Sequence, residues 1–95
     1  MKFSIEKLPT DLLLELAEKH KSLRKHAGYS QRELAERSGV SLASIKRFEQ
    51  TGLISLESLL QLAAVLDRLK DFETVFNPTE DFSRIEQLFT KTPRK

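Results

Sequence analysis

The side chains that could do acid–base or metal chemistry in this 95-residue chain are few and scattered. His20 and His26 are six positions apart, which places them on different faces of a helix, and no Cys or carboxylate spacing completes a metal site. We therefore expect both histidines at the surface. Glu80 and Asp81 form one acidic pair after Pro78, where negative charge favours a helix N-terminus rather than catalysis. The sequence predicts no catalytic residue, no metal, no cofactor and no enzyme.

Charge distribution is the stronger chemical signal. Between residues 19 and 50, eight Lys and Arg stand against three Glu, a net charge of +5. Between residues 51 and 90, three basic residues stand against seven acidic ones, a net charge of −4. A basic block followed by an acidic block favours one surface that faces a polyanion and another that faces water or a protein. Two ordinary solvated surfaces would give the same totals.

The composition indicates one small helical domain. Hydrophobic residues make up 39% and charged residues 32%, with only three Gly and three Pro, so helix-favouring residues dominate. The absence of Cys excludes disulfides and thiolate-bound zinc. The longest apolar runs are a few residues, and residues 1–6 lack the apolar stretch of a signal peptide. We expect a cytoplasmic, all-α, single domain over residues 1–95.

Capping residues divide the chain into helices. Ser30 with Glu33 forms a capping box for a helix over residues 31–38, and Ser41 caps a helix over residues 42–50 that ends at Gly52. The other expected elements are an extended segment 1–9, a helix from Thr10 or Asp11 to Ala27, an apolar central helix after Ser55, a short fifth helix Arg68–Phe76 and an extra C-terminal helix after Thr79.

The two short helices 31–38 and 42–50 form a helix-turn-helix pattern. Gly39 lies in the turn between them, where the lack of a β-carbon permits a positive φ. The helices can cross closely because Ala35 is small, and Val40 and Ile45 fill the angle between them. The second helix is then free to project its outer residues into the major groove of DNA.

On these residues the segment 19–66 resembles the helix-turn-helix domain of the Cro and lambda-repressor type, the xenobiotic-response-element regulators. The matching positions are Leu23-Arg24, Gly28-Tyr29-Ser30-Gln31, Leu34-Ala35, Gly39-Val40-Ser41, Ile45, Phe48-Glu49, Gly52 and the helix with Leu56, Leu59, Ala63 and Leu66. The resemblance implies a five-helix, lambda-repressor-like DNA-binding domain. Residues 67–95 would then be a C-terminal extension for dimer or partner contacts.

The resemblance also implies the roles of individual residues. The expected base contacts are those of outward residues on the second helix, because Lys and Arg can donate to guanine and Leu and Ala can pack on thymine methyls: Leu42, Ala43, Lys46 and Arg47. The expected phosphate contacts come from Ser30, Gln31, Arg32, Ser41 and Ser44. Arg24 and Glu49 are expected to form a structural ion pair.

Two kinds of function fit this domain. The first is a repressor that binds a palindromic double-stranded DNA operator as a homodimer and regulates its own operon. The second is an antitoxin that neutralises a toxin and represses the operon with it, because the layout is loosely similar to the antitoxins of HipA-type kinase toxin pairs. Seven apolar residues motivate the second hypothesis, although they could equally form a sixth helix or a dimer seam: Phe72, Val75, Phe76, Phe82, Ile85, Leu88 and Phe89.

Overall fold

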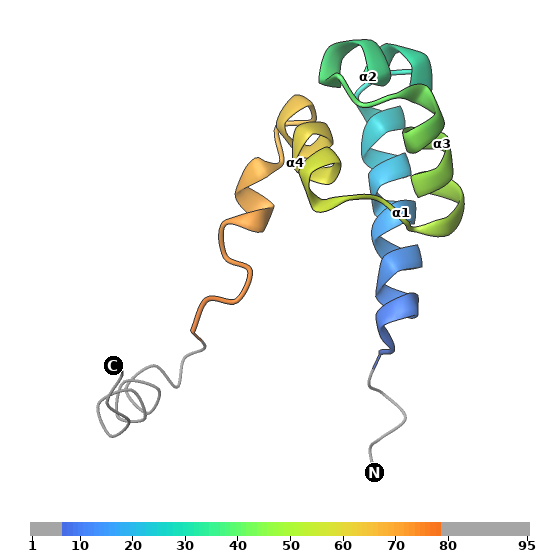
Figure 1. Cartoon of the computed structure of the whole chain (residues 1–95). Coiled ribbons are helices and arrows are strands. Elements are labelled where there is room, and N and C mark those ends of the chain that lie inside the picture. Colours follow the sequence, from blue (N-terminus) through green and yellow to red (C-terminus); the bar gives the residue numbers. More distant parts are fainter. Residues whose placement is uncertain (1–6, 79–95) are drawn as a thin grey trace, which may run out of the picture.

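The computed structural model describes residues 7–78, which form four α-helices and one short 3-10 helix without a strand. The helices are α1 (Pro9–His26), α2 (Gln31–Ser38), α3 (Leu42–Thr51) and α4 (Leu56–Val65), and the 3-10 helix is η2 (Leu69–Phe72). The long helix α1 carries α3 along its side, while α2 packs against both α3 and α4 (Figure 1). The expected extended segment 1–9 falls largely on residues 1–6, and the extra helix falls on residues 79–95. Both lie outside the described residues.

Helix α1 begins slightly earlier than its sequence indicated. Pro9 occupies the first helical position, where its missing N–H costs nothing. Leu8 is the N-cap residue, and its backbone N–H donates to the Asp11 carboxylate at 3.0 Å. Asp11 therefore lies inside the first turn of the helix and is not the N-cap. At the other end Gly28 adopts a φ of +88°, and the N–H of Tyr29 donates to the carbonyl of Arg24 at 3.1 Å. This is a Schellman ending, and it sets the direction in which the chain enters α2.

Serine caps define the starts of the next three helices, as the sequence predicted. The Ser30 hydroxyl accepts from the Glu33 N–H at 3.0 Å, and the Glu33 carboxylate accepts from the Ser30 N–H at 2.8 Å. Ser41 caps α3 and Ser55 caps α4 through the same kind of bond to the residue three positions on. Each cap satisfies an N–H that the first turn of a helix leaves without a partner. The capping box is therefore confirmed.

The hydrophobic core is centred on the helix-turn-helix unit. Its fully or nearly fully buried members are Ala17, Leu34, Val40, Ile45, Phe48 and Leu62. The prediction that α4 is the central core helix is wrong, because only Leu62 and Ala63 of that helix are buried and Leu56 is 67% exposed. Leu59 and Val65 of α4 are half-buried against the core, whereas Leu56 and Ala64 stay exposed in the described part of the chain.

The expected fifth α-helix over Arg68–Phe76 is also wrong. Asp67 takes a φ of +61° and ends α4, which leaves η2 as a four-residue 3-10 helix followed by turns. A segment this short cannot offset the cost of helix nucleation without a cap, and Arg68 offers no side-chain cap. None of the helices described above combines the length and the apolar character that crossing a membrane requires.

Candidate nucleic-acid interface

The turn between α2 and α3 has the geometry that a helix-turn-helix requires. Gly39 ends α2 with a φ of +80°, a conformation that side-chain-bearing residues rarely adopt. Val40 in the turn is buried, and Leu34 and Ile45 on the two flanking helices are completely buried. Ala35 is half-buried against the same cluster, which agrees with the close crossing expected from its size. These contacts fix the angle between α2 and α3.

The outer face of α3 carries the four residues expected to read bases. Ala43, Lys46 and Arg47 are exposed, whereas Leu42 is half-buried. The opposite face holds the buried residues Ile45 and Phe48. A helix with small and basic residues on its free face can enter the major groove and offer donors to base edges.

Arg24 and Glu49 form a two-pronged ion pair that joins α1 to the end of α3. Arg24 Nε donates to Glu49 Oε2 and Arg24 Nη2 donates to Glu49 Oε1, both at 2.9 Å. The third nitrogen, Nη1, donates to the carbonyl of Tyr29 at 2.9 Å. The two side chains are only 8% and 3% exposed, so the pair is shielded from water and from salt. Its parallel geometry is the one that guanidinium and carboxylate groups favour.

Gln31 belongs to the same network. Its Nε2 donates to Glu49 Oε1 at 3.0 Å, which links the first residue of α2 to the end of α3. Burial raises the pKa of Glu49, but the hydrogen bonds from Arg24 and Gln31 and the charge of Arg24 outweigh burial, and the pKa falls below its ordinary value. The carboxylate is therefore charged at neutral pH, and the amide of Gln31 retains a second N–H for another acceptor.

His20 contradicts the prediction that both histidines lie at the surface. It is buried on the core face of α1 together with Ala17 and Arg24, while His26 is exposed. The His20 ring meets the ring of Phe48 edge-on at 5.0 Å between centroids, and its Nδ1 lies 2.9 Å from Glu49 Oε2. Burial lowers the pKa of His20 and outweighs the opposing pull of Glu49. Helical spacing could have indicated the burial, because His20 lies four positions before Arg24.

The residues expected to contact phosphate gather at the N-termini of α2 and α3. Ser30 caps α2, and Gln31 and Arg32 form its first turn. The Ser41 hydroxyl donates to the Ser44 hydroxyl at 2.9 Å. Because Ser44 is the acceptor in this bond, its own O–H can donate to another group. Helix N-termini with free donors suit anionic oxygens.

Two of the expected DNA contacts share one hollow beside α3. Ser44 and Arg47, assigned to phosphate and to base respectively, line a depression of about 220 Å³ together with Ser55 and Ser58 from the start of α4. Leu53 and Ile54 complete the lining. A cation with hydroxyl groups beside it is a setting that an anionic oxygen can occupy. On this side of α3, an expected phosphate contact and an expected base contact therefore lie next to each other, closer than the sequence implied.

Tyr29 is one of the positions that match the family, but the sequence predicted no role of its own for it. Its carbonyl accepts from Arg24, and the Arg37 guanidinium lies over its ring at 5.0 Å from the centroid. This cation–π contact joins the entry of α2 to its last turn. No sequence signal beyond the aromatic ring next to the glycine turn could have identified it.

The fold and the interface define the class of protein. Residues 21–71, more than half of the chain, match the model of the helix-turn-helix family, so the chain belongs to that family. This is the Cro and lambda-repressor type that the sequence motif indicated, a class of DNA-binding transcription regulators that are typically not enzymes.

One curated relative is similar over most of the chain. A protein of Pyrococcus furiosus, provisionally named an HTH-type transcriptional regulatory protein, is 33% identical over 78 residues. The match covers 80% of this chain and 23% of that protein, so the chain spans less than a quarter of the length of the relative. No solved structure matches the chain significantly.

Proposed function

We propose that this chain binds a specific double-stranded DNA operator and represses transcription, including that of its own operon. The observation that carries the proposal is the outer face of α3, where Ala43, Lys46 and Arg47 are exposed on a helix whose far end is fixed to α1 by Glu49 and Arg24. A rigidly held helix with small and basic residues on its free face suits the major groove.

In this proposal the residues divide into two groups. Outward residues of α3 contact base edges: Leu42, Ala43, Lys46 and Arg47. Residues at the starts of α2 and α3 contact phosphates: Ser30, Gln31, Arg32, Ser41 and Ser44. The division is supported by the exposure of Ala43, Lys46 and Arg47 in the first group and by the free donors of Gln31 and Ser44 in the second. Phosphate contacts fix the position of the protein, and base contacts supply sequence specificity.

We further propose that the functional unit is a homodimer on a palindromic operator. One helix-turn-helix reads only a few base pairs, so two half-sites related by a two-fold axis are needed for useful specificity. Residues 67–95 are the proposed dimer or partner extension. Footprints should then show two protected half-sites about 34–36 Å apart or a multiple of that distance. A monomer that protects one half-site contradicts the proposal.

Salt dependence tests DNA binding directly. A duplex selected from random DNA by the purified protein is titrated by fluorescence anisotropy at several salt concentrations. We expect log K to fall with log salt by about 0.9 for each phosphate contact. Lys46→Glu should abolish binding, whereas Lys70→Glu, an equal charge reversal on the exposed 3-10 helix, should reduce it only slightly. A flat salt response, or equal losses in the two variants, rules out α3 as the DNA face.

A second candidate function is that of an antitoxin. It is favoured by the exposed apolar side chains after η2, since Val75 is 53% exposed and Phe76 is completely exposed. Apolar side chains of this kind suit a protein partner. Expression of the chain together with the product of the neighbouring gene should then yield a stable complex that Phe76→Ser weakens. Separate elution of the two proteins removes this candidate.

A further inference from the structure

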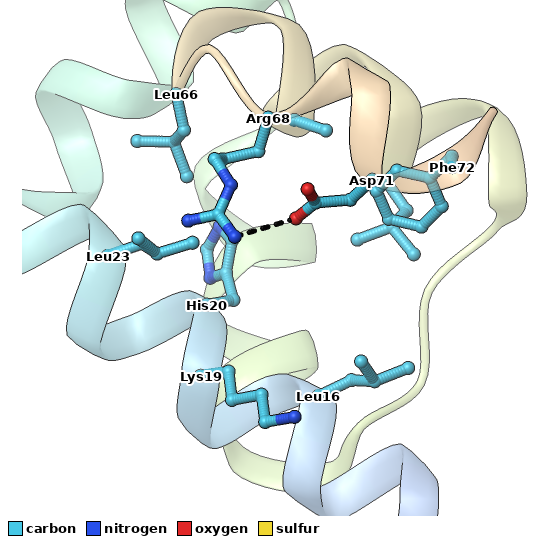
Figure 2. A pocket seen from close by; sticks show the side chains of 10 residues that line it. Leu16, Lys19, His20, Leu23, Leu66, Arg68, Asp71 and Phe72 are labelled. Atoms are coloured by element: carbon cyan, nitrogen blue, oxygen red, sulfur yellow. Dashed lines mark ion pairs between the residues drawn. The ribbon is translucent and has the colours of Figure 1, made fainter. Parts of the chain in front are cut away.

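His20 lies between the Arg24–Glu49 pair and a cavity. One side of its ring faces Phe48 and Glu49, as described above. The other side lines an apolar cavity of about 120 Å³ between α1, α4 and η2, bordered by Leu16 and Leu23 of α1 and by the ion pair between Arg68 and Asp71 (Figure 2). The side chain is only 6% exposed, and neither ring nitrogen makes a hydrogen bond of regular geometry within the described part of the chain.

Burial of such a group requires a reason. A polar nitrogen that is taken out of water without a good partner destabilises the fold, and an apolar side chain of similar volume would avoid that cost. The packing against Phe48 alone could be provided by a phenylalanine or a leucine. What an apolar side chain cannot provide is a polar nitrogen 2.9 Å from Glu49 Oε2.

The surroundings of Glu49 indicate what this nitrogen does. Oε1 accepts from Arg24 and from Gln31, and Oε2 accepts from Arg24. His20 Nδ1 lies 2.9 Å from Oε2, without a hydrogen bond of regular geometry but close enough for electrostatic attraction when Nδ1 carries the ring proton. The carboxylate therefore has four polar contacts, two at each oxygen, and these restrict its rotation away from Gln31.

We propose that His20 is a positioning residue for DNA binding: its imidazole holds the Glu49 carboxylate, and the carboxylate holds Gln31 in the orientation that contacts DNA. This inference rests on the proposed function. The polar groups close to the ring are Glu49 and Arg24 on the network side, and Lys19, Arg68 and Asp71 line the cavity on the other side. Among these polar groups, Glu49 is the one that accepts a hydrogen bond from α2, through Gln31.

A double-mutant cycle tests the coupling between His20 and Gln31. His20→Phe keeps an aromatic ring beside Phe48 and removes the nitrogen. DNA affinity is measured at one salt concentration for the wild type, His20→Phe, Gln31→Ala and the double variant. We expect His20→Phe to weaken binding about tenfold, a typical loss for a polar contact to a charged group. Gln31→Ala should then add little in the His20→Phe background. If the losses of DNA affinity in the two single variants multiply in the double variant, the two residues act independently and the proposal is overturned.

Two variants control for folding. His20→Asn carries an amide nitrogen near the position of Nδ1 and should restore most of the affinity. His26→Phe, on the exposed face of the same helix, should leave it unchanged. If His20→Phe melts below the assay temperature, His20→Leu takes its place in the cycle. Failure of His20→Asn to bind better than the apolar variant, with both folded, also overturns the proposal.

A measurement without DNA separates this inference from the proposed function. In nuclear magnetic resonance spectra of the free protein, the side-chain amide of Gln31 should be shifted from its solvent value. It should return toward that value in His20→Phe and not in His20→Asn. If the shift behaves in this way but the wild type binds no DNA, the proposed function fails and the positioning contact remains. If the wild type binds DNA but the chemical shift of the Gln31 amide does not change in His20→Phe, only the positioning role is contradicted.

Discussion

Gly52 lies against the backbone of Leu13, where α3 ends beside the first half of α1. A β-carbon at Gly52 would come within 2.8 Å of the carbonyl carbon, the carbonyl oxygen and the β-carbon of Leu13. Gly52 also takes a φ of +82°, so two independent constraints act at one position. The glycine at the end of α3 thus allows the close contact between α1 and α3 in addition to ending the helix.

Replacement of this glycine should therefore cost more than replacement of an unconstrained one. Gly39 has a similar φ of +80°, but a β-carbon there would meet nothing within 4 Å. Gly39→Ala should destabilise by about 1–2 kcal/mol through backbone strain. Gly52→Ala should add about 1–3 kcal/mol of overpacking to that strain. Thermal unfolding of the two variants measures the difference, and equal melting temperatures would show that α1 shifts to accept the methyl group.

Removal of Glu49 should expose the cost of a buried charge. Glu49→Ala leaves the Arg24 guanidinium shielded from water without its partner, which typically costs about 3–5 kcal/mol. Glu36→Ala removes an exposed carboxylate from α2 and should change stability by less than about 0.5 kcal/mol. Urea unfolding gives both values. Similar midpoints for the two variants would mean that the pair adds nothing to the fold.

Stability should fall on acidification, and His20 should account for part of the loss. Because burial lowers the pKa of His20 from its ordinary 6.5, the unfolded state binds the proton more readily. The contribution is therefore complete above pH 6.5 and is lost as the pH falls toward the lower folded pKa. The pKa of Glu49 is also lowered, so its contribution is lost at still lower pH, as the pH falls from 4.5 through the folded pKa.

The pH dependence can be assigned by substitution. Between pH 7 and 5, His20→Phe should flatten the curve of unfolding free energy against pH. His26→Phe, at an exposed position, should leave the slope of the wild type intact. Substitution of a cation next to the ring, such as Arg24, would itself change the slope of unfolding free energy against pH. The comparison therefore leaves these cations in place. A slope that survives His20→Phe would assign the loss to another group.

Base contact and phosphate contact should differ in their effect on specificity. Arg47→Ala should lose about 1–3 kcal/mol on the cognate operator and little on random DNA, because a base contact is lost. Gln31→Ala should weaken binding to both duplexes evenly. Anisotropy at one fixed salt concentration compares them. Because Arg47 shares a hollow with Ser44, Ser55 and Ser58, equal losses on both duplexes would reassign it to phosphate.

Local signals explain what could be predicted from the sequence. The helix starts at Gln31, Leu42 and Leu56 follow from serine caps, which act within three residues of the helix end. The turn at Gly39 follows from the requirement for a positive φ. The family follows from the joint spacing of these features and does not depend on long-range contacts.

Long-range contacts explain what could not be predicted. The contact of His20 with Glu49 joins two different helices, so a rule that places histidines at the surface cannot include it, although helical spacing already places His20 on the same face of α1 as Arg24. The fifth α-helix was wrongly predicted over Arg68–Phe76, because after the positive φ of Asp67 the chain forms only the 3-10 helix Leu69–Phe72. The assignments of Lys46, Arg47 and the serines to base or phosphate remain predictions, because they depend on the shape of the DNA as well as on the protein.

The attachment of α3 at both ends has a thermodynamic consequence. Ser41 fixes its first turn, and Gly52 against Leu13 fixes its last. A ten-residue helix held in this way has little conformational entropy left to lose when it docks. Adjustment to an imperfect site must then come from bending of the duplex or from the few rotatable side chains on the outer face. The affinity of a helix held in this way should therefore depend strongly on the flexibility of the DNA, even at base pairs that the protein does not contact.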